Sequence, residues 1–367
     1  MRWKSWVTSG IPITGAALVF ATWGSNQSAL FAAILAVFHV VLVLVSVSHA
    51  ESIAHRIGEP YGTLILALAV TVIEVSLVVT LMITEGDKAA TLARDTVFAA
   101  IMIVCNGVVG LSILVKARKS KLVRFSEQGA NALLGTVLTI ATLSLVVPNF
   151  TSSSEGATFT GSQFAFSAVS AFVVYSIFVF VQTRSHRWMF LSPDALNDEI
   201  DDKHSIDSNY ESRAGMHDSI VLRTVMLVLG LGGVVGLAKT LSPQIESAVV
   251  WFGAPQAFVG VVIALMILLP ETIAALRAAN RDEMQMSLNL SLGSALASIG
   301  LTIPAIAIAS IWLDGPIYLG LGPKEIVLLA LTAIVSGLTF GSGQATLLQG
   351  VQHLAIFAAF MFLTLVP

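Results

Sequence analysis

Residues 258–276 read FVGVVIALMILLPETIAAL, an apolar run long enough to cross most of a bilayer and interrupted by one carboxylate, Glu271. Residues 61–84, YGTLILALAVTVIEVSLVVTLMIT, repeat this arrangement around Glu74. An acidic side chain at the centre of a bilayer costs about 2.5 to 3.5 kcal/mol on helix-insertion scales, and such side chains mark ion pathways and proton relays. The two glutamates therefore predict one functional site built from two halves of a membrane protein.

The composition of the 367-residue chain is that of a protein with many membrane spans. Hydrophobic residues make up 56% and charged residues 11% of the chain, and the mean hydropathy is +0.86. This is too much apolar surface for a soluble domain. Apolar runs of about 20 residues predict eleven helices, near 8–24, 29–48, 61–84, 95–115, 132–148, 163–183, 219–240, 254–276, 286–310, 323–340 and 346–366. The expected fold class is all-α, a polytopic membrane protein.

The basic residues predict the orientation, because short cytoplasmic loops are enriched in Lys and Arg. With the N-terminus inside, four of the nineteen basic residues fall outside, and the other fifteen fall on the cytoplasmic side. The four are Lys88, Arg94, Lys239 and Lys324. We therefore expect an integral membrane protein with a cytoplasmic N-terminus and an external C-terminus.

One long polar segment, residues 184–218, divides the chain. It separates an N-terminal helix (1–28) and five further helices (29–183) from the last five helices (219–367). Five is an odd number, so the second unit must be inserted upside down relative to the first. Inverted repeats are typical of secondary transporters, whose sites lie near the midplane where the repeats meet.

Helical geometry places oxygen ligands beside the two glutamates. Thr71 shares a face with Glu74, and small residues share a face with Glu271, which lets another helix backbone approach closely. Pro270 has no N–H and displaces the carbonyl group four residues back, so the oxygen of Met266 is expected to be free. Hard cations take such oxygen ligands. These residues are the predicted core of a metal site, and the two glutamates are its predicted proton-binding groups.

A stripe of hydroxyl groups follows one face of the predicted helix over 286–310. It consists of Ser287, Ser291, Ser294, Ser298 and Thr302. We expect Ser294 and Ser298 to bind metal and the others to line a polar pathway. The predicted helix over 95–115 adds Asp95 to the pathway and Asn106 as a ligand. The alternative for each is a structural role, since hydroxyls in membrane helices also bond to their own backbone or to a neighbouring helix.

Two buried carboxyl groups suit the exchange of a cation for protons. Burial disfavours a charged carboxylate, so the empty site holds protons, whereas a divalent cation stabilises both carboxylates and displaces the protons. The site is neutral in both states, and an empty, doubly charged site is too costly to cross the membrane. We interpret the chain as a secondary active antiporter that exports calcium in exchange for protons by alternating access.

At these residues the chain resembles the calcium/proton exchanger (CAX) family of the cation/calcium exchanger superfamily, and most of all its bacterial ChaA-type branch. Residues 50–62, AESIAHRIGEPYG, are similar to the lead into the family's first repeat motif, and Glu74 falls where that motif has its glutamate. Residues 258–271, followed by Asn280 and Gly293-Ser294, resemble the second motif. The resemblance covers nearly the whole chain. It implies eleven helices, one N-terminal helix plus two inverted five-helix repeats, in a bacterial plasma membrane.

Departures from the family pattern concern the choice of ion. The usual Gly-Asn-x-x-Glu reads VTVIE at 70–74 and ILLPE at 267–271, so both asparagines are missing, and Ala297 stands where relatives have glutamine. Fewer neutral oxygens weaken selectivity for calcium, which fits the ChaA-type branch, associated with calcium, sodium and potassium exchange for protons. Sodium or potassium transport with little calcium preference is therefore the alternative.

The polar segment resembles the acidic cytoplasmic segment of the family. We interpret it either as a regulatory segment that gathers or senses calcium, or as a solvated linker. Its acidic residues include Asp194, Asp198, Glu199, Asp201, Asp202 and Asp207.

Other functional classes fit the sequence less well. A cation channel usually forms its pore from a ring of subunits, whereas an internal inverted duplication places two gates around one site. The sequence contains no His-Glu-x-x-His, no Gly-x-Ser-x-Gly and no phosphate-binding loop with Lys. We therefore expect neither enzyme activity nor a cofactor. The expected partners are the lipid bilayer and the transported cations, and we expect no binding of nucleic acid. The sequence does not decide whether the protein forms a homo-oligomer.

Overall fold

The structure is a computed structural model, and it describes most of the chain. The described residues are 2–25, 27–57, 71–76, 78–80, 82–83, 90–191, 220–251, 253, 255, 257–312 and 317–366. Their elements are helices, apart from two short strands and one isolated bridge. The predicted all-α class is confirmed.

Eight helices among the described residues are long and apolar enough to cross a membrane. They comprise α2 (Ala29–Ile57), α4 with α5 (Leu92–Met102 and Val109–Ala117, joined by a π-helical turn at Ile103–Val108), α6 (Glu127–Ala141, continuing to Phe150), α7 (Gly161–Phe180, continuing to Ser185), α9 (Ile220–Trp251), α11 (Met284–Ala309), α12 (Pro323–Phe340) and α13 (Leu347–Leu365).

Three further helical segments complete the described set. Helix α10 (Ala257–Asn280) is bent by 53° between Leu269 and Glu271, and it makes a ninth span if its two parts are counted as one. Helix α1 (Arg2–Thr22) and the segment Thr71–Thr80 supply shorter apolar helices. Every predicted span thus overlaps a described helix. The total of eleven spans stays a prediction, because residues 58–70 and 84–89, around the third span, lie outside the described residues.

Several helices begin at residues that satisfy their free N–H groups. Helix α7 starts with a capping box in which Thr160 and Gln163 bond to each other's backbone, and Thr346 and Gln349 do the same for α13. Helix α12 has Pro323 in its first turn, where the missing N–H costs nothing. These local signals place the ends of the helices that surround the site.

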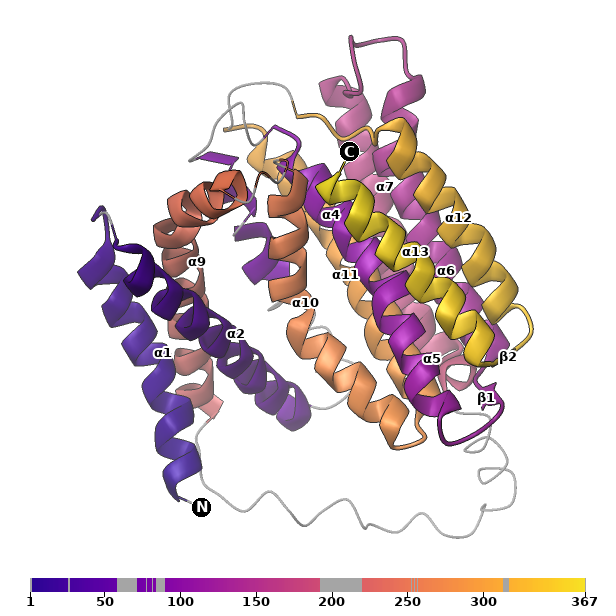
Figure 1. Cartoon of the computed structure of the whole chain (residues 1–367), viewed down its shortest axis with the longest axis horizontal. Helices are drawn as coiled ribbons and strands as arrows, with labels where there is room; N and C mark the ends of the chain where they lie inside the picture. Colours follow the sequence, from indigo (N-terminus) through magenta and orange to yellow (C-terminus); the bar gives the residue numbers. More distant parts are fainter. Residues whose placement is uncertain are drawn as a thin grey trace.

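The helices form two groups that lie side by side in Figure 1. Helices α1, α2 and α9 pack together on one side, while α4 to α7 and α11 to α13 form the larger group, with α10 between the two. Glycines allow close approach in the smaller group: a Cβ atom on Gly236 would lie 2.5 Å from Val19, and one on Gly233 would lie 3.0 Å from Leu42. The start of α1 and the end of α13 lie at opposite ends of the molecule (Figure 1).

The span over Leu92–Ala117 is the most enclosed helix of the larger group. Of its most apolar window, 89% is buried, compared with 22% for the peripheral α13. A helix that is apolar on all sides is suited to such a central place. Around it, α7 exposes large side chains such as Phe166 and Phe172, as expected of a surface that faces lipid. The helix that carries the hydroxyl stripe, α11, packs beside this central span.

Short strand pairs join loops from the two halves of the chain. Strand β1 (Val123–Arg124) pairs antiparallel with β2 (Gln344–Ala345), with Val123 opposite Ala345. An isolated antiparallel bridge joins Thr158 to Tyr318. Both connections link a loop before residue 184 to a loop after residue 218.

Candidate functional site

The carboxyl group of Glu74 is buried against α11. Only 2% of Glu74 is exposed, and the Ser298 hydroxyl donates a 2.6 Å hydrogen bond to its Oε1 atom. The hydroxyl of Thr302, one helical turn further, also lies close to this carboxyl group. Within the described residues, however, Thr302 does not meet hydrogen-bond geometry with any partner. The structure therefore brings together the first predicted glutamate and the predicted hydroxyl stripe, which lie in different halves of the chain.

Thr71 lies one turn before Glu74 on the same helical segment and is 5% exposed. That it shares the glutamate's face stays a prediction. Its role as a metal ligand stays a prediction.

The second glutamate, Glu271, follows the bend of α10 and is half-buried. The bend falls at Pro270, whose missing N–H and bulky ring disturb the helix. Helix α10 packs against both α4 and α11. Glu271 is thus carried by a helix that flanks the one bonded to Glu74. The meeting of the two carboxyl groups, and the Met266 carbonyl as a ligand, stay predictions.

Gly260 is one of the small residues on the face of α10 that carries Glu271, and a neighbouring helix approaches it closely. A Cβ atom at this position of α10 would lie 3.0 Å from backbone atoms of Asp95 and Thr96 on α4. Because glycine has no side chain there, the two helices pack backbone to backbone.

The hydroxyl stripe of α11 divides into two parts. Ser287 donates to the Ser112 hydroxyl at 2.9 Å, and Ser291 donates to the Ser287 carbonyl at 2.7 Å. These two hydroxyls tie helices together or bond to their own backbone, which favours the structural role for this end of the stripe. At the other end, Ser298 and Thr302 are buried and lie at the Glu74 carboxyl group, while Ser294 between the two parts is half-buried.

Asn106 is fully buried in a polar network of its own, within the π-helical turn of the central span. Its Nδ2 donates to the Thr332 hydroxyl at 2.9 Å, and its Oδ1 lies 3.3 Å from Nδ1 of His353. Nε2 of His353 lies 3.2 Å from the Thr339 hydroxyl. Because both ends of the amide are engaged, the network favours a structural role for Asn106. Sequence reasoning missed these partners, since they come from α12 and α13 and carry no local signal.

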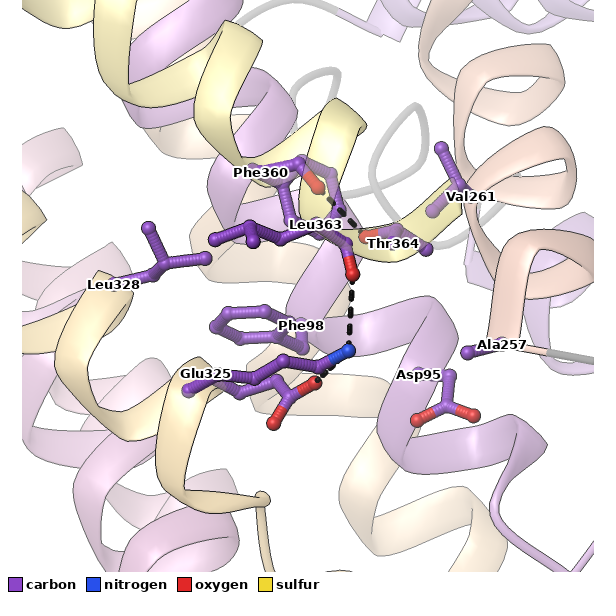
Figure 2. A pocket seen from close by; sticks show the side chains of 10 residues that line it. Asp95, Phe98, Ala257, Val261, Glu325, Leu328, Phe360, Leu363 and Thr364 are labelled. Atoms are coloured by element: carbon purple, nitrogen blue, oxygen red, sulfur yellow. Dashed lines mark hydrogen bonds and ion pairs between the residues drawn. The ribbon is translucent and has the colours of Figure 1, made fainter. Parts of the chain in front are cut away.

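Asp95 lies in the first turn of α4 and lines a pocket between α4, α10, α12 and α13 (Figure 2). Its carboxylate accepts a 2.7 Å hydrogen bond from Arg94 Nε and a 2.9 Å bond from the Thr91 hydroxyl. Lys324, which also lines the pocket, donates to the Leu363 carbonyl at 2.9 Å and lies 3.6 Å from Glu325. The pocket mixes charged and apolar side chains at one end of the bundle. Its part in the predicted polar pathway stays a prediction.

Charged residues meet partners that the predicted orientation places on the same side. On the predicted cytoplasmic side, Lys116 donates to Asp282 at 2.6 Å, and this hydrogen bond holds the pKa of Asp282 below its ordinary value. On the predicted external side, Arg94 donates to the Gly320 carbonyl at 3.1 Å, and Lys239 lies 4.7 Å from the centre of the Trp23 ring. Each contact joins residues that the predicted topology places at one end of the bundle, and which end is cytoplasmic stays a prediction.

The acidic residues of the polar segment, from Asp194 to Asp207, lie outside the described residues. Within the part of the chain that is described, no three His, Cys, Asp or Glu side chains gather into a metal site.

Comparison with known proteins defines the class of this chain. The sequence model of the family described as sodium/calcium exchanger protein matches residues 27–184 and 222–366. The chain belongs to this family, and it is an integral membrane protein. The resemblance to calcium/proton exchangers and to ChaA-type antiporters is confirmed.

Two curated relatives cover most of the chain. It is 42% identical over 325 residues to the putative ionic transporter y4hA of Sinorhizobium fredii, covering 89% of this chain and 86% of the relative. It is 33% identical over 353 residues to the sodium-potassium/proton antiporter ChaA of Escherichia coli, covering 94% of this chain and 93% of ChaA.

Solved structures share the fold at low identity. Native YfkE aligns with a TM-score of 0.71 and 18% identity, covering 97% of this chain and 99% of YfkE. The H⁺/Ca²⁺ exchanger CAX aligns with a TM-score of 0.69 and 13% identity, covering 98% of this chain and 88% of the CAX chain. At these identities the likeness defines the fold.

Proposed function

We propose that this chain is a secondary active cation/proton antiporter that exports calcium from the cytoplasm in exchange for protons. The observation that carries the proposal is the buried carboxyl group of Glu74, bonded at 2.6 Å to Ser298 of the other half of the chain. An intramembrane carboxyl group held between two halves of a transporter is suited to bind either a proton or a cation. Membership of an exchanger family supports the same function.

Inverted repeats at 29–183 and 219–367 belong to the proposal, and the loop contacts support them. The β1–β2 pair joins the loop after α5 to the loop before α13. The Thr158–Tyr318 bridge joins the loop before α7 to the loop after α11. If each loop of one repeat is replaced by its counterpart in the other repeat, the β1–β2 connection corresponds to the Thr158–Tyr318 connection. Helix packing follows the same rule, since α5 packs on α13 as α11 packs on α7. The two separate family matches agree with this division.

The proposed mechanism is a competition at Glu74 and Glu271. Desolvation favours the protonated carboxyl groups when no cation is present. A cation that enters between them stabilises the carboxylates, and the protons leave on the side from which the cation came. Because the empty, charged site is costly in the membrane, the two repeats change conformation only when the site holds protons or a cation.

The alternative cargo is sodium or potassium with little preference for calcium. ChaA, at 33% identity, is described as a sodium-potassium/proton antiporter. The scarcity of clustered carboxylates among the described residues also suits monovalent ions, which need less negative charge.

The test is proton flux in everted membrane vesicles that contain the full chain. After respiration acidifies the lumen, calcium, sodium and potassium are added separately, and a pH-sensitive dye reports the release of protons. The proposal predicts release on addition of calcium. Release with sodium or potassium alone would favour the alternative cargo, and no release with any of the three would contradict antiport.

A further inference from the structure

We infer that the hydroxyl oxygen of Thr302 is a direct ligand of the transported cation and helps the site to select a cation over protons. The inference rests on the proposed function and adds a residue to the same site. Sequence reasoning gave Thr302 only a place along a polar pathway, together with Ser287 and Ser291.

The hydroxyls of α11 differ in what they bond to. Ser287, Ser291 and Ser298 each donate a hydrogen bond of 2.6 to 2.9 Å to a defined acceptor. Thr302 is fully buried, yet among the described residues its oxygen has no hydrogen-bond partner. Buried threonines in helices can bond to their own backbone, as Thr332 does to the Leu328 carbonyl at 2.8 Å. Thr302, like Thr96 and Ser336, has no such bond among the described residues, and of these three Thr302 is the one that acts on the Glu74 carboxyl group.

A buried hydroxyl without a partner is costly, so such groups in native structures are explained by a ligand or a functional role. The Thr302 oxygen lies close to the Glu74 carboxyl group, where a cation would be attracted. Hydroxyl oxygens carry lone pairs that suit a hard cation. A cation beside Glu74 would therefore satisfy the oxygen that the cation-free protein leaves unsatisfied.

Ser298 and Thr302 then have different effects on the same carboxylate. The proton of the Ser298 hydroxyl is committed to Glu74 Oε1, so Ser298 acts on the charge of the carboxylate and on its competition with protons. Thr302 also interacts with the carboxylate, more weakly than Ser298 does, and the lone pairs of its oxygen stay open to the cation. Loss of the Thr302 hydroxyl should chiefly weaken cation binding, whereas loss of the Ser298 hydroxyl should chiefly change the pH dependence of transport.

The test uses the full chain in proteoliposomes with an imposed pH gradient, with calcium as the probe. Thr302→Val removes the hydroxyl and keeps the shape of the side chain, Thr302→Ser keeps the hydroxyl, and Ser291→Ala is the control from the structural part of the stripe. We expect Thr302→Val to raise the apparent KM for calcium about tenfold, the size of one contact to a charged group. The maximal rate should change little. Thr302→Ser and Ser291→Ala should stay within about twofold of the wild type.

Three results would overturn the inference. The first is a calcium KM for Thr302→Val within twofold of the wild type. The second is a loss of maximal rate or of folded protein without a rise in KM, which indicates a packing role. The third is a rise in KM for Thr302→Ser as large as for Thr302→Val. If Thr302→Val does not fold, Thr302→Ala replaces it in the same comparison. A wild-type protein that moves no cation in response to the pH gradient would instead contradict the proposed function itself.

Discussion

Ser298 and Glu74 lie 224 positions apart in the chain, and the hydroxyl of the first donates a 2.6 Å hydrogen bond to the carboxyl group of the second. Both side chains are buried, at 5% and 2% exposure. A hydrogen bond from a neutral donor stabilises a buried carboxylate, because no water is present to solvate its charge. Ser298 is therefore placed to set how readily Glu74 exchanges its proton.

The Ser298→Ala variant should need a higher pH for transport. Without the donor, the charged form of Glu74 is less stable, so the carboxyl group keeps its proton to a higher pH. A hydrogen bond to a charged group contributes about 1.5 to 3 kcal/mol, so we expect the pH profile of cation transport to move by about one unit or more. Transport measured across a pH series checks this, with Ser291→Ala as the control. A profile that coincides with the wild type would exclude this role for Ser298.

Substitution of Gly260 should destabilise the protein. The new Cβ atom of Gly260→Ala would lie 3.0 Å from the backbone of Asp95 and Thr96, so α4 and α10 must move apart. Overpacking of this kind costs about 1 to 3 kcal/mol, and Tm in detergent should fall. Gly293→Ala is the matched control, since a Cβ atom there meets nothing within 4 Å. Equal Tm values for both variants would show that the close approach at Gly260 does not matter.

Replacement of Asn106 should affect stability more than transport. The variant Asn106→Ala leaves Thr332 and His353 without their buried partner, which costs about 1 to 3 kcal/mol. We expect a lower Tm and an unchanged apparent KM for calcium in the remaining folded protein. The opposite pattern, a raised KM at unchanged Tm, would restore Asn106 as the metal ligand that the sequence suggested.

The ion pair between Lys116 and Asp282 predicts a small pH effect on stability. Lys116 lowers the pKa of Asp282, so the pair stabilises the folded protein above the ordinary carboxyl pKa of 3.8. The contribution is lost as pH falls through the lower, folded-state value. Lys116→Gln should reduce Tm slightly at neutral pH, and the difference from the wild type should disappear in strong acid. A difference that persists there would show that Lys116 acts through packing instead.

The helices follow from the sequence because the thickness of a bilayer fixes the length of each apolar run. The predicted span 323–340 coincides with α12. The bend of α10 falls between Leu269 and Glu271, at the proline for which we expected a displaced carbonyl group. Helix ends were less predictable. Helix α2 continues to Ile57 and α9 to Trp251, beyond the predicted ends at 48 and 240, since a helix does not have to stop where its apolar residues do.

The site follows from the sequence only in part. Helical periodicity placed Ser298 on a hydroxyl face, and the apolar run around Glu74 marked that carboxylate as exceptional, but neither pattern reveals which helix faces meet. The contact between these two residues, and the network that joins His353 to Asn106, depend on how distant helices pack. For the same reason, the sequence grouped Thr302, which lies at the carboxyl group, with Ser287 and Ser291, which tie helices together or bond to their own backbone.

The most direct test of the account is transport by Glu74→Gln and Glu271→Gln in everted vesicles, with wild-type vesicles as the reference. Glutamine keeps the size and hydrogen-bonding capacity of each side chain and removes its exchangeable proton and its charge. The account predicts that each variant, although folded and inserted, releases no protons from acidified vesicles when calcium, sodium or potassium is added. Proton-coupled movement of any of these cations by both variants would contradict the competition between proton and cation at this pair of carboxyl groups.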